Sequence, residues 1–396
     1  MRIALIGTRG VPAHYGGFET AVEEVGRRLA DRGHEVVVFC RPTGDGDRAD
    51  EYLGMRLVHL PALHRRSLET LSHTALSVVN RAMRGVDAAV LFNAANSPLL
   101  PVIRARRIPV ATHVDGLEWK RAKWGPVGQR YYRAAESLAV RWSDALIADA
   151  QGIADYYREE FSAPTSLIAY GAPILTDGES DRLEELELAP GKYHLMVARF
   201  EPENHVHEIV AGYCRSSATL PLVVVGSAPY SNEYTAKIHG AADGRVRFLG
   251  GVWDQAQLDQ LYGNALTYLH GHSVGGTNPS LLRAAGAATF TIAFDVDFNR
   301  EVLGQPAAYF NSEDDIAEAL VAAEEDPAGT QQRGKALQEA VRRYDWDDVA
   351  GRYEELCRLL AAGEFSRRRP SGRRSHTARG HAAQGELRPR RRSDAR

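Results

Sequence analysis

The sequence has few cysteines and no long hydrophobic run. Only Cys40, Cys214 and Cys357 occur among 396 residues, without a C-x-x-C pair or metal-ligand spacing. A disulfide-stapled scaffold is therefore excluded, and no zinc site is indicated. No apolar stretch approaches the ~18 residues of a membrane-spanning helix, and the opening M-R-I-A-L-I-G is interrupted too early for a signal peptide. We expect a cytoplasmic protein that does not span a membrane.

The sequence also lacks a dinucleotide-binding fingerprint and a convincing metal site. Gly7 and Gly10 do not continue as G-x-G-x-x-G, and no ribose-binding acid follows the second expected strand, which argues against a dehydrogenase. The D-V-D at 295–297 imitates a metal-binding D-x-D, and the H-G-H at 270–272 has ligand-like spacing, but neither has evident further ligands. We read both as loop or cleft residues and expect no metal and no cofactor.

Net charge is only −3, but it is unevenly distributed along the chain. Residues 364–396 hold eleven arginines against three acidic residues and almost nothing apolar. Such a segment cannot bury enough surface to fold alone, so we expect disorder. It suits contact with anionic lipid headgroups, and equally a merely solvated extension. A nucleic acid is not expected as a partner.

Short apolar segments alternate with segments of helical periodicity along most of the chain. Examples are the strands R-I-A-L-I-G and E-V-V-V-F-C around the helix expected at 18–33. Continuous apolar strands that alternate with helices predict parallel sheets covered on both faces. We predict an α/β protein with two Rossmann-like doubly wound domains facing a cleft. The predicted parts are an N-terminal domain (1–172), a linker (173–190), a C-terminal domain (191–343), a terminal helix (344–362) and a disordered Arg-rich tail (363–396).

The terminal helix has an apolar face that needs a partner. Its members recur at helical spacing: Trp346, Val349, Tyr353, Leu356, Leu359 and Leu360. The helix could close the second domain or cross back to pack on the first.

Two glycine-rich loops each follow a strand and open a helix. In G-T-R-G-V-P-A-H-Y-G-G-F-E-T, residues 7–20, Gly16 and Gly17 allow close backbone approach to a ligand. In H-G-H-S-V-G-G-T-N-P-S-L-L, residues 270–282, Pro279 is placed as the first residue of a helix. The free N–H groups of a helix start can hold a diphosphate. We therefore expect the loops to face each other across the cleft.

Three further polar residues follow expected strands. Arg199 ends Y-H-L-M-V-A-R and could clamp phosphate oxygens with its planar guanidinium. His113 ends I-P-V-A-T-H and is followed closely by Asp115, which places both at the mouth of the cleft. We interpret His113 as a hydrogen-bonding or acid–base group beside the reacting centre.

Taken together, these motifs resemble the retaining glycosyltransferases of family 4, which adopt the GT-B fold. The resemblance rests on residues 7–20 and 270–282 together with T-H-V-D-G-L-E-W, V-A-R-F-E-P-E-N, V-V-V-G-S-A-P-Y-S-N-E-Y and A-F-D-V-D-F-N-R-E-V-L-G. They look like the branch with bacterial capsular and cell-surface rhamnosyltransferases. The resemblance implies sugar transfer from a nucleotide-diphosphate donor, with retention at the anomeric carbon and without metal or covalent intermediate. It also implies that the terminal helix crosses back to the first domain.

The resemblance places the family's glycine loop on Gly16 and Gly17, its cleft histidine on His113 and its phosphate-clamping arginine on Arg199. Three of the family's positions differ in this chain. Asn204 stands where a lysine is usual, and Gly275 and Arg283 stand where the family has two glutamates. A guanidinium cannot accept hydrogen bonds from a ribose diol, so position 283 predicts altered donor contacts, weak activity or an inactive relative.

We expect a transferase that moves a sugar, with rhamnose a candidate, to a saccharide or lipid-linked acceptor in surface polysaccharide or glycolipid synthesis. The first domain would bind the acceptor and the second the nucleotide sugar, at the inner face of the plasma membrane. A non-catalytic nucleotide-sugar-binding relative, a GT-B epimerase or phosphorylase, and a polyanion-binding factor remain alternatives. The residues assigned to catalysis are His113 and Arg199, and those assigned to donor or substrate binding are Gly16, Gly17, Glu19, Asp115, Asn204, Gly275, Gly276, Thr277, Asn278, Ser280 and Arg283.

Overall fold

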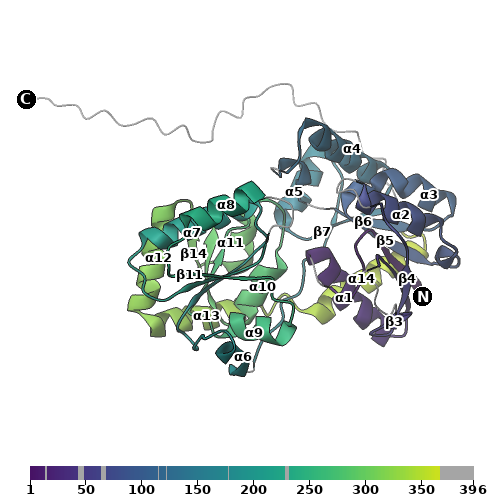
Figure 1. Ribbon diagram of the computed structural model, residues 1–396. Coiled ribbons are helices and arrows are strands. Elements are labelled where there is room, and N and C mark those ends of the chain that lie inside the picture. Colours follow the sequence, from purple (N-terminus) through teal and green to yellow (C-terminus); the bar gives the residue numbers. More distant parts are fainter. Residues whose placement is uncertain are drawn as a thin grey trace, which may run out of the picture.

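The computed structural model shows two α/β domains side by side, joined by a linker and by the last helix (Figure 1). The structure describes residues 1–13, 16–42, 49–63, 68–114, 116–121, 123–176, 178–227 and 232–365. The predicted tail lies outside this part of the chain from residue 366 onward.

The first domain is built on an eight-stranded sheet in the order β3-β4-β2-β1-β5-β6-β7-β8. All neighbouring strands are parallel except β3 and β4. The strands are β1 (Arg2–Ile6), β2 (Glu35–Cys40), β3 (Glu51–Tyr52), β4 (Met55–His59), β5 (Ala88–Phe92), β6 (Val110–His113), β7 (Ala145–Ala148) and β8 (Ser166–Leu167). The helices are α1 (Gly17–Asp31), α2 (Glu69–Val79), α3 (Leu100–Ala105), α4 (Pro126–Trp142) and α5 (Gln151–Phe161).

Alternate side chains of the central strands enter two hydrophobic cores, one on each face of this sheet. Ile3 and Leu5 of β1 pack in one core with Val22 of α1, and Ala4 and Ile6 pack in the other with residues of α2 and α3. Burial on both faces requires apolar residues at every strand position, which explains the unbroken hydrophobic runs in the sequence.

The second domain repeats this design on a six-stranded sheet in the order β11-β10-β9-β12-β13-β14, with all strands parallel. The strands are β9 (His194–Val197), β10 (Leu222–Val225), β11 (Val246–Gly250), β12 (Thr267–His270), β13 (Phe290–Phe294) and β14 (Ala308–Phe310). The helices are α7 (Val206–Arg215), α8 (Asn232–Ala241), α9 (Gln255–Gly263), α10 (Pro279–Gly286), α11 (Asp297–Leu303), α12 (Glu313–Glu325) and α13 (Pro327–Val341).

The segment between the two sheets packs along the second domain. It contains the short helix α6 (Asp181–Glu184), and Leu175 N–H donates to the carbonyl of Gly286 at the end of α10. Gln338 of α13 donates to the carbonyls of both Leu175 and Gly286. These hydrogen bonds tie the segment to α10 and α13.

Helix α14 (Trp346–Ala361) follows the second domain in sequence but packs on the first. Trp346, Tyr353 and Cys357 are buried in the same core as the first-domain strands, whereas Leu359 is only half-buried. Asp345 caps the helix by accepting from the N–H groups of residues 347 and 348.

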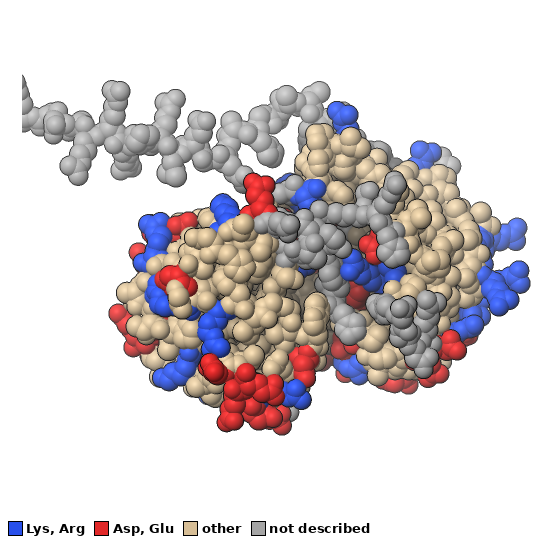
Figure 2. Space-filling view, viewed as in Figure 1, with Lys and Arg blue, Asp and Glu red and all other residues tan. Residues whose placement is uncertain are grey.

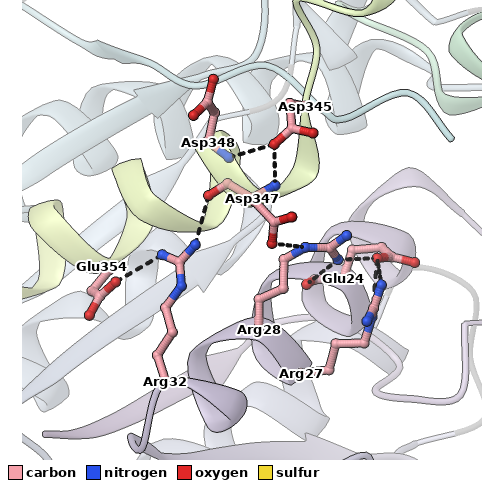
Figure 3. A network of polar contacts seen from close by, with 8 residues as sticks. All are labelled: Glu24, Arg27, Arg28, Arg32, Asp345, Asp347, Asp348 and Glu354. Carbon is pink, nitrogen blue, oxygen red and sulfur yellow. Dashed lines mark hydrogen bonds and ion pairs between the residues drawn. The ribbon is translucent and has the colours of Figure 1, made fainter. Parts of the chain in front are cut away.

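A polar rim borders the contact between α1 and α14 (Figure 3). Arg28 Nε donates to Asp347 Oδ1 at 2.9 Å, and Arg32 donates to the Asp347 carbonyl and to Glu354. The last helix is thus fixed to the first domain by apolar packing and by ion pairs.

Within residues 1–365, apart from the gaps given above, no helix combines the length and hydrophobicity needed to span a membrane.

Candidate active site

A cavity of about 490 Å³ lies between the two domains and is lined by residues of both. It borders the loops that follow the carboxyl ends of strands, where open parallel sheets usually bind ligands. Figure 2 shows side chains of both charges gathered in the hollow between the domains. The residues assigned to the site from sequence that line this cavity are Gly16, Gly17, Glu19, Arg199, Gly275, Gly276, Thr277 and Asn278.

The first glycine loop supplies one wall of the cavity. Gly16 is the N-cap residue of α1. Its backbone is extended, and as a glycine it offers no side chain to cap the helix. The Glu19 carboxylate accepts a hydrogen bond from Arg9 N–H at 3.1 Å, so it fixes the loop to the start of α1. A Cβ on Gly17 would lie 3.3 Å from Pro279 of the other domain. The first loop therefore contacts the second loop across the cavity.

The second glycine loop forms the opposite wall. Asn278 caps α10 by accepting from Ser280 N–H, and Pro279 occupies the first helical position. Thr277 Oγ1 donates to the carbonyl of Asp149, which follows β7 in the first domain, at 2.7 Å. A Cβ on Gly276 would collide with the Asp149 carboxylate. A side chain at this position would displace the Asp149 carboxylate and the end of Ile153, so the two domains approach closely here.

A charged cluster from both domains surrounds Arg199. Arg199 and Arg121 each place an Nη atom 3.6 Å from Glu201 Oε2, and Arg121 also lies 3.4 Å from Glu203 Oε1. Arg199 Nη2 and Arg121 Nη1 therefore lie close to each other, on either side of the same carboxylate oxygen. Burial opposes ionisation of Glu201, but the positive charges of Arg199, Lys123 and Arg121 outweigh it and lower its pKa. One carboxylate thus bridges cations that come from different domains.

Asn204 lies behind Arg199, outside the cavity wall. Its Nδ2 donates to the Arg199 carbonyl at 2.8 Å, and its Oδ1 lies 2.9 Å from Nδ1 of His272. Burial, assisted by the charges of Arg121 and Arg199, lowers the pKa of His272 well below its usual value. Asn204 therefore orients the backbone of Arg199 and a neutral histidine on the cavity wall.

His113 is fully buried and lies outside the set of cavity-lining residues. Its Nδ1 is 2.9 Å from the Tyr353 hydroxyl of α14, and its Nε2 is 4.0 Å from Asp149 Oδ2, beyond hydrogen-bond distance. Burial lowers the pKa of His113 to about 3, so the ring is neutral at neutral pH. Its ring packs against the ring of Phe18, and Phe18 lines the cavity.

Two other predicted residues, Ser280 and Arg283, do not line the cavity. Ser280 Oγ lies 3.2 Å from the Tyr262 hydroxyl, and Arg283 forms an ion pair with Asp259 of α9. Asp115 lies outside the described residues. The guanidinium expected to face the donor phosphates at position 283 is therefore directed to a neighbouring helix.

Several charged residues that line the cavity were not predicted from the sequence. Arg121 follows the T-H-V-D-G-L-E-W segment, and Asp149 follows β7 directly, which is the same positional signal that singled out Arg199. Arg41 follows β2 in the same way and was not assigned to the site from the sequence. Glu201 carries no such signal, because it follows its strand by several residues.

Two family models match the chain, one for each domain. The model described as a glycosyl transferase 4-like domain matches residues 16–171, and the one described as glycosyl transferases group 1 matches residues 191–326. Together they cover most of the described chain. Among curated protein sequences, none matches this one.

Solved structures share the whole two-domain arrangement at low sequence identity. Sucrose-phosphate synthase from Thermosynechococcus elongatus has a TM-score of 0.79 and 20% identity, over 91% of this chain and 99% of that one. HepE from Anabaena, in complex with UDP-glucose, has a TM-score of 0.73 and 18% identity, over 91% and 100%. A UDP-forming trehalose-phosphate synthase from Burkholderia xenovorans, in complex with glucose-6-phosphate, has a TM-score of 0.71 and 13% identity, over 90% and 100%.

Proposed function

We propose that this chain, which belongs to the glycosyltransferases of the GT-B fold, transfers a sugar from a nucleotide-diphosphate donor to an acceptor bound in the cavity between its domains. The observation that carries the proposal is the meeting of two glycine loops, one from each domain, beside the guanidinium of Arg199. Structurally similar proteins of this fold are complexed with UDP-glucose and glucose-6-phosphate. Those two ligands are a nucleotide sugar and a sugar phosphate, which supports sugar transfer from a nucleotide-diphosphate donor here.

The second domain would hold the donor diphosphate. The N-terminal end of α10, with its positive dipole, and the guanidinium of Arg199 border the same cavity, and both attract anions. Departure of the nucleoside diphosphate develops negative charge, which fixed donors stabilise in the transition state. The proposed reaction needs no metal ion for this step, because the protein supplies the positive charge.

Arg121 would supply the second cation on the diphosphate. The family's usual lysine is replaced by Asn204, which faces the backbone of Arg199. Arg121 reaches the same carboxylate as Arg199 from the first domain, so closure of the domains brings the second positive charge to the site. Glu201 would give up these two partners when the diphosphate binds.

His113 would act as a neutral hydrogen-bonding group. A pKa of about 3 leaves no proton to donate as an imidazolium at neutral pH, which favours the hydrogen-bonding role over acid catalysis. Tyr353 would fix the orientation of the ring through Nδ1. The resemblance to family 4 supports retention by a front-face route, in which the acceptor attacks from the side that the diphosphate leaves.

The proposal extends to the sugar, the product and the place of the reaction. The branch resemblance supports rhamnose as the sugar and a surface polysaccharide or glycolipid as the product, made at the cytoplasmic face of the membrane. The Arg-rich segment 366–396, outside the described residues, would contact anionic lipids.

A transfer assay with a panel of labelled nucleotide sugars tests the proposal. We expect transfer from at least one donor, with the anomeric configuration of the product retained in NMR spectra. Gly17→Val should still bind nucleotide but lose transfer, because a larger side chain presses on Pro279 across the cavity. Donor binding without transfer to any acceptor would favour a non-catalytic relative, and sugar interconversion without acceptor would favour an epimerase.

A further inference from the structure

Two arginines of the first domain converge on one carboxylate in the wall of the cavity. Arg9 follows β1, and Arg41 follows β2 directly. Arg41 Nη1 lies 3.0 Å from Glu69 Oε1, and Arg9 Nη2 lies 3.7 Å from Glu69 Oε2. All three residues line the cavity, and so does Thr70. One carboxylate therefore lies between two guanidiniums here as well.

Arg41 is a buried charge that is incompletely satisfied by the protein. Only 8% of its surface is exposed, and burial lowers its pKa, with the nearby charge of Glu69 acting in the opposite direction. Nη2 donates to Thr70 Oγ1 at 2.8 Å, but among the described residues Nε has no hydrogen-bond partner. An arginine stays protonated even here, so an unsatisfied donor is costly unless a ligand accepts from it.

The start of α2 adds a second source of positive potential at the same place. Its N-cap residue is Leu68, and among the described residues, which omit 64–67, no side chain caps the helix. The first N–H groups of an uncapped helix lack acceptors and attract anions. Glu69 and Thr70 are the first two residues of this helix, so Arg41 contacts its N-terminal turn through both of them.

We propose that Arg9, Arg41 and the N-terminal turn of α2 form a subsite for a phosphate or diphosphate group on the acceptor. This inference rests on the proposed function and names the acceptor's chemistry. The Glu69 carboxylate marks where an anion is held between the guanidiniums, and phosphate oxygens would take its place on the Nη atoms of Arg41 and Arg9. Glu69 would give up both guanidiniums to the phosphate, and Glu19, which also acts on Arg41 electrostatically, lowers the positive potential of the subsite. The phosphate could belong to a sugar phosphate or to a lipid-linked sugar diphosphate.

Calorimetric titration of the full chain with glucose, glucose 6-phosphate and farnesyl diphosphate, in the presence of UDP, tests this subsite. We expect at least one of the two anionic probes to bind and glucose not to bind. Arg41→Gln and Arg9→Gln should each weaken that binding on the order of tenfold. Arg104→Gln is the matched control, because Arg104 forms a first-domain ion pair with Asp144 outside the cavity.

The outcomes separate this inference from the proposed function. Failure to bind any of UDP, dTDP, GDP and ADP would contradict the proposed function itself. Nucleotide binding without binding of either anionic probe, or with wild-type probe affinity in both arginine variants, would overturn the subsite alone. Binding of only glucose 6-phosphate would identify a sugar phosphate as the source, and binding of only farnesyl diphosphate a lipid. If Arg41→Gln unfolds, Arg9→Gln carries the test, because Arg9 is more exposed.

Discussion

At the scale of single residues, burial decides what the histidines near the cavity can do. His113 and His270 have pKa values lowered to about 3 by burial, and that of His73 is lowered to about 4. The sequence placed His113 at the end of a strand but could not show that its ring lies beneath the cavity wall. It likewise could not show that Arg283 pairs with Asp259, because a neighbour from another helix is not encoded in local spacing.

These buried histidines predict a loss of stability in mild acid. In the unfolded chain a histidine takes up a proton near pH 6.5, whereas in the folded chain these three do so only near pH 3 to 4. The unfolded state therefore binds more protons below pH 6.5, and the free energy of unfolding should fall as the pH is lowered from there to about 4.

Urea unfolding at several pH values measures this effect. His270→Gln should reduce the slope between pH 6.5 and 4, because it removes one of these buried imidazoles. An unfolding free energy that stays constant over this interval would contradict the account.

At the scale of elements, hydrophobic periodicity predicted the strands and helices well, because strands buried on both faces leave an unbroken apolar signature. The helix expected at 18–33 is α1 (Gly17–Asp31), and the helix expected to begin at Pro279 is α10 (Pro279–Gly286). Helix α5 (Gln151–Phe161) was not predicted, since its segment is polar and carries no strong cap. The α/β fold of GT-B type is confirmed.

The contact between the two glycine loops predicts that a single methyl group will hold the domains apart. Gly276→Ala should reduce transfer at least tenfold, because the added Cβ collides with the Asp149 carboxylate and meets Ile153. Small-angle X-ray scattering should show a larger radius of gyration for Gly276→Ala than for the wild type.

Gly240→Ala is the control for this change, since a Cβ there meets no atom within 4 Å and the residue lies within α8. It should keep full transfer activity and gain slightly in stability. Wild-type transfer and wild-type dimensions in Gly276→Ala would contradict the proposed role of the loop contact.

At the scale of the whole molecule, the chain crosses between its domains more than once. Helix α14 follows the second domain but completes the first-domain core, where its Tyr353 reaches His113. Arg121 of the first domain contacts Glu201 of the second, and Thr277 of the second domain contacts Asp149 of the first. Sequence patterns indicated two domains and a cleft, but not these cross-domain pairs, because they depend on how the domains meet.

The central claim is that a nucleotide sugar binds in this cavity with its diphosphate on Arg199. Its most direct test is calorimetric titration of UDP, dTDP, GDP and ADP into the wild type, Arg199→Gln and Arg215→Gln. Arg215 is the control, since it pairs with Glu313 on the second domain outside the cavity. We predict that at least one nucleotide binds the wild type and Arg215→Gln equally, and Arg199→Gln on the order of tenfold more weakly. Binding of no nucleotide, or equal affinity in all three proteins, would contradict the account.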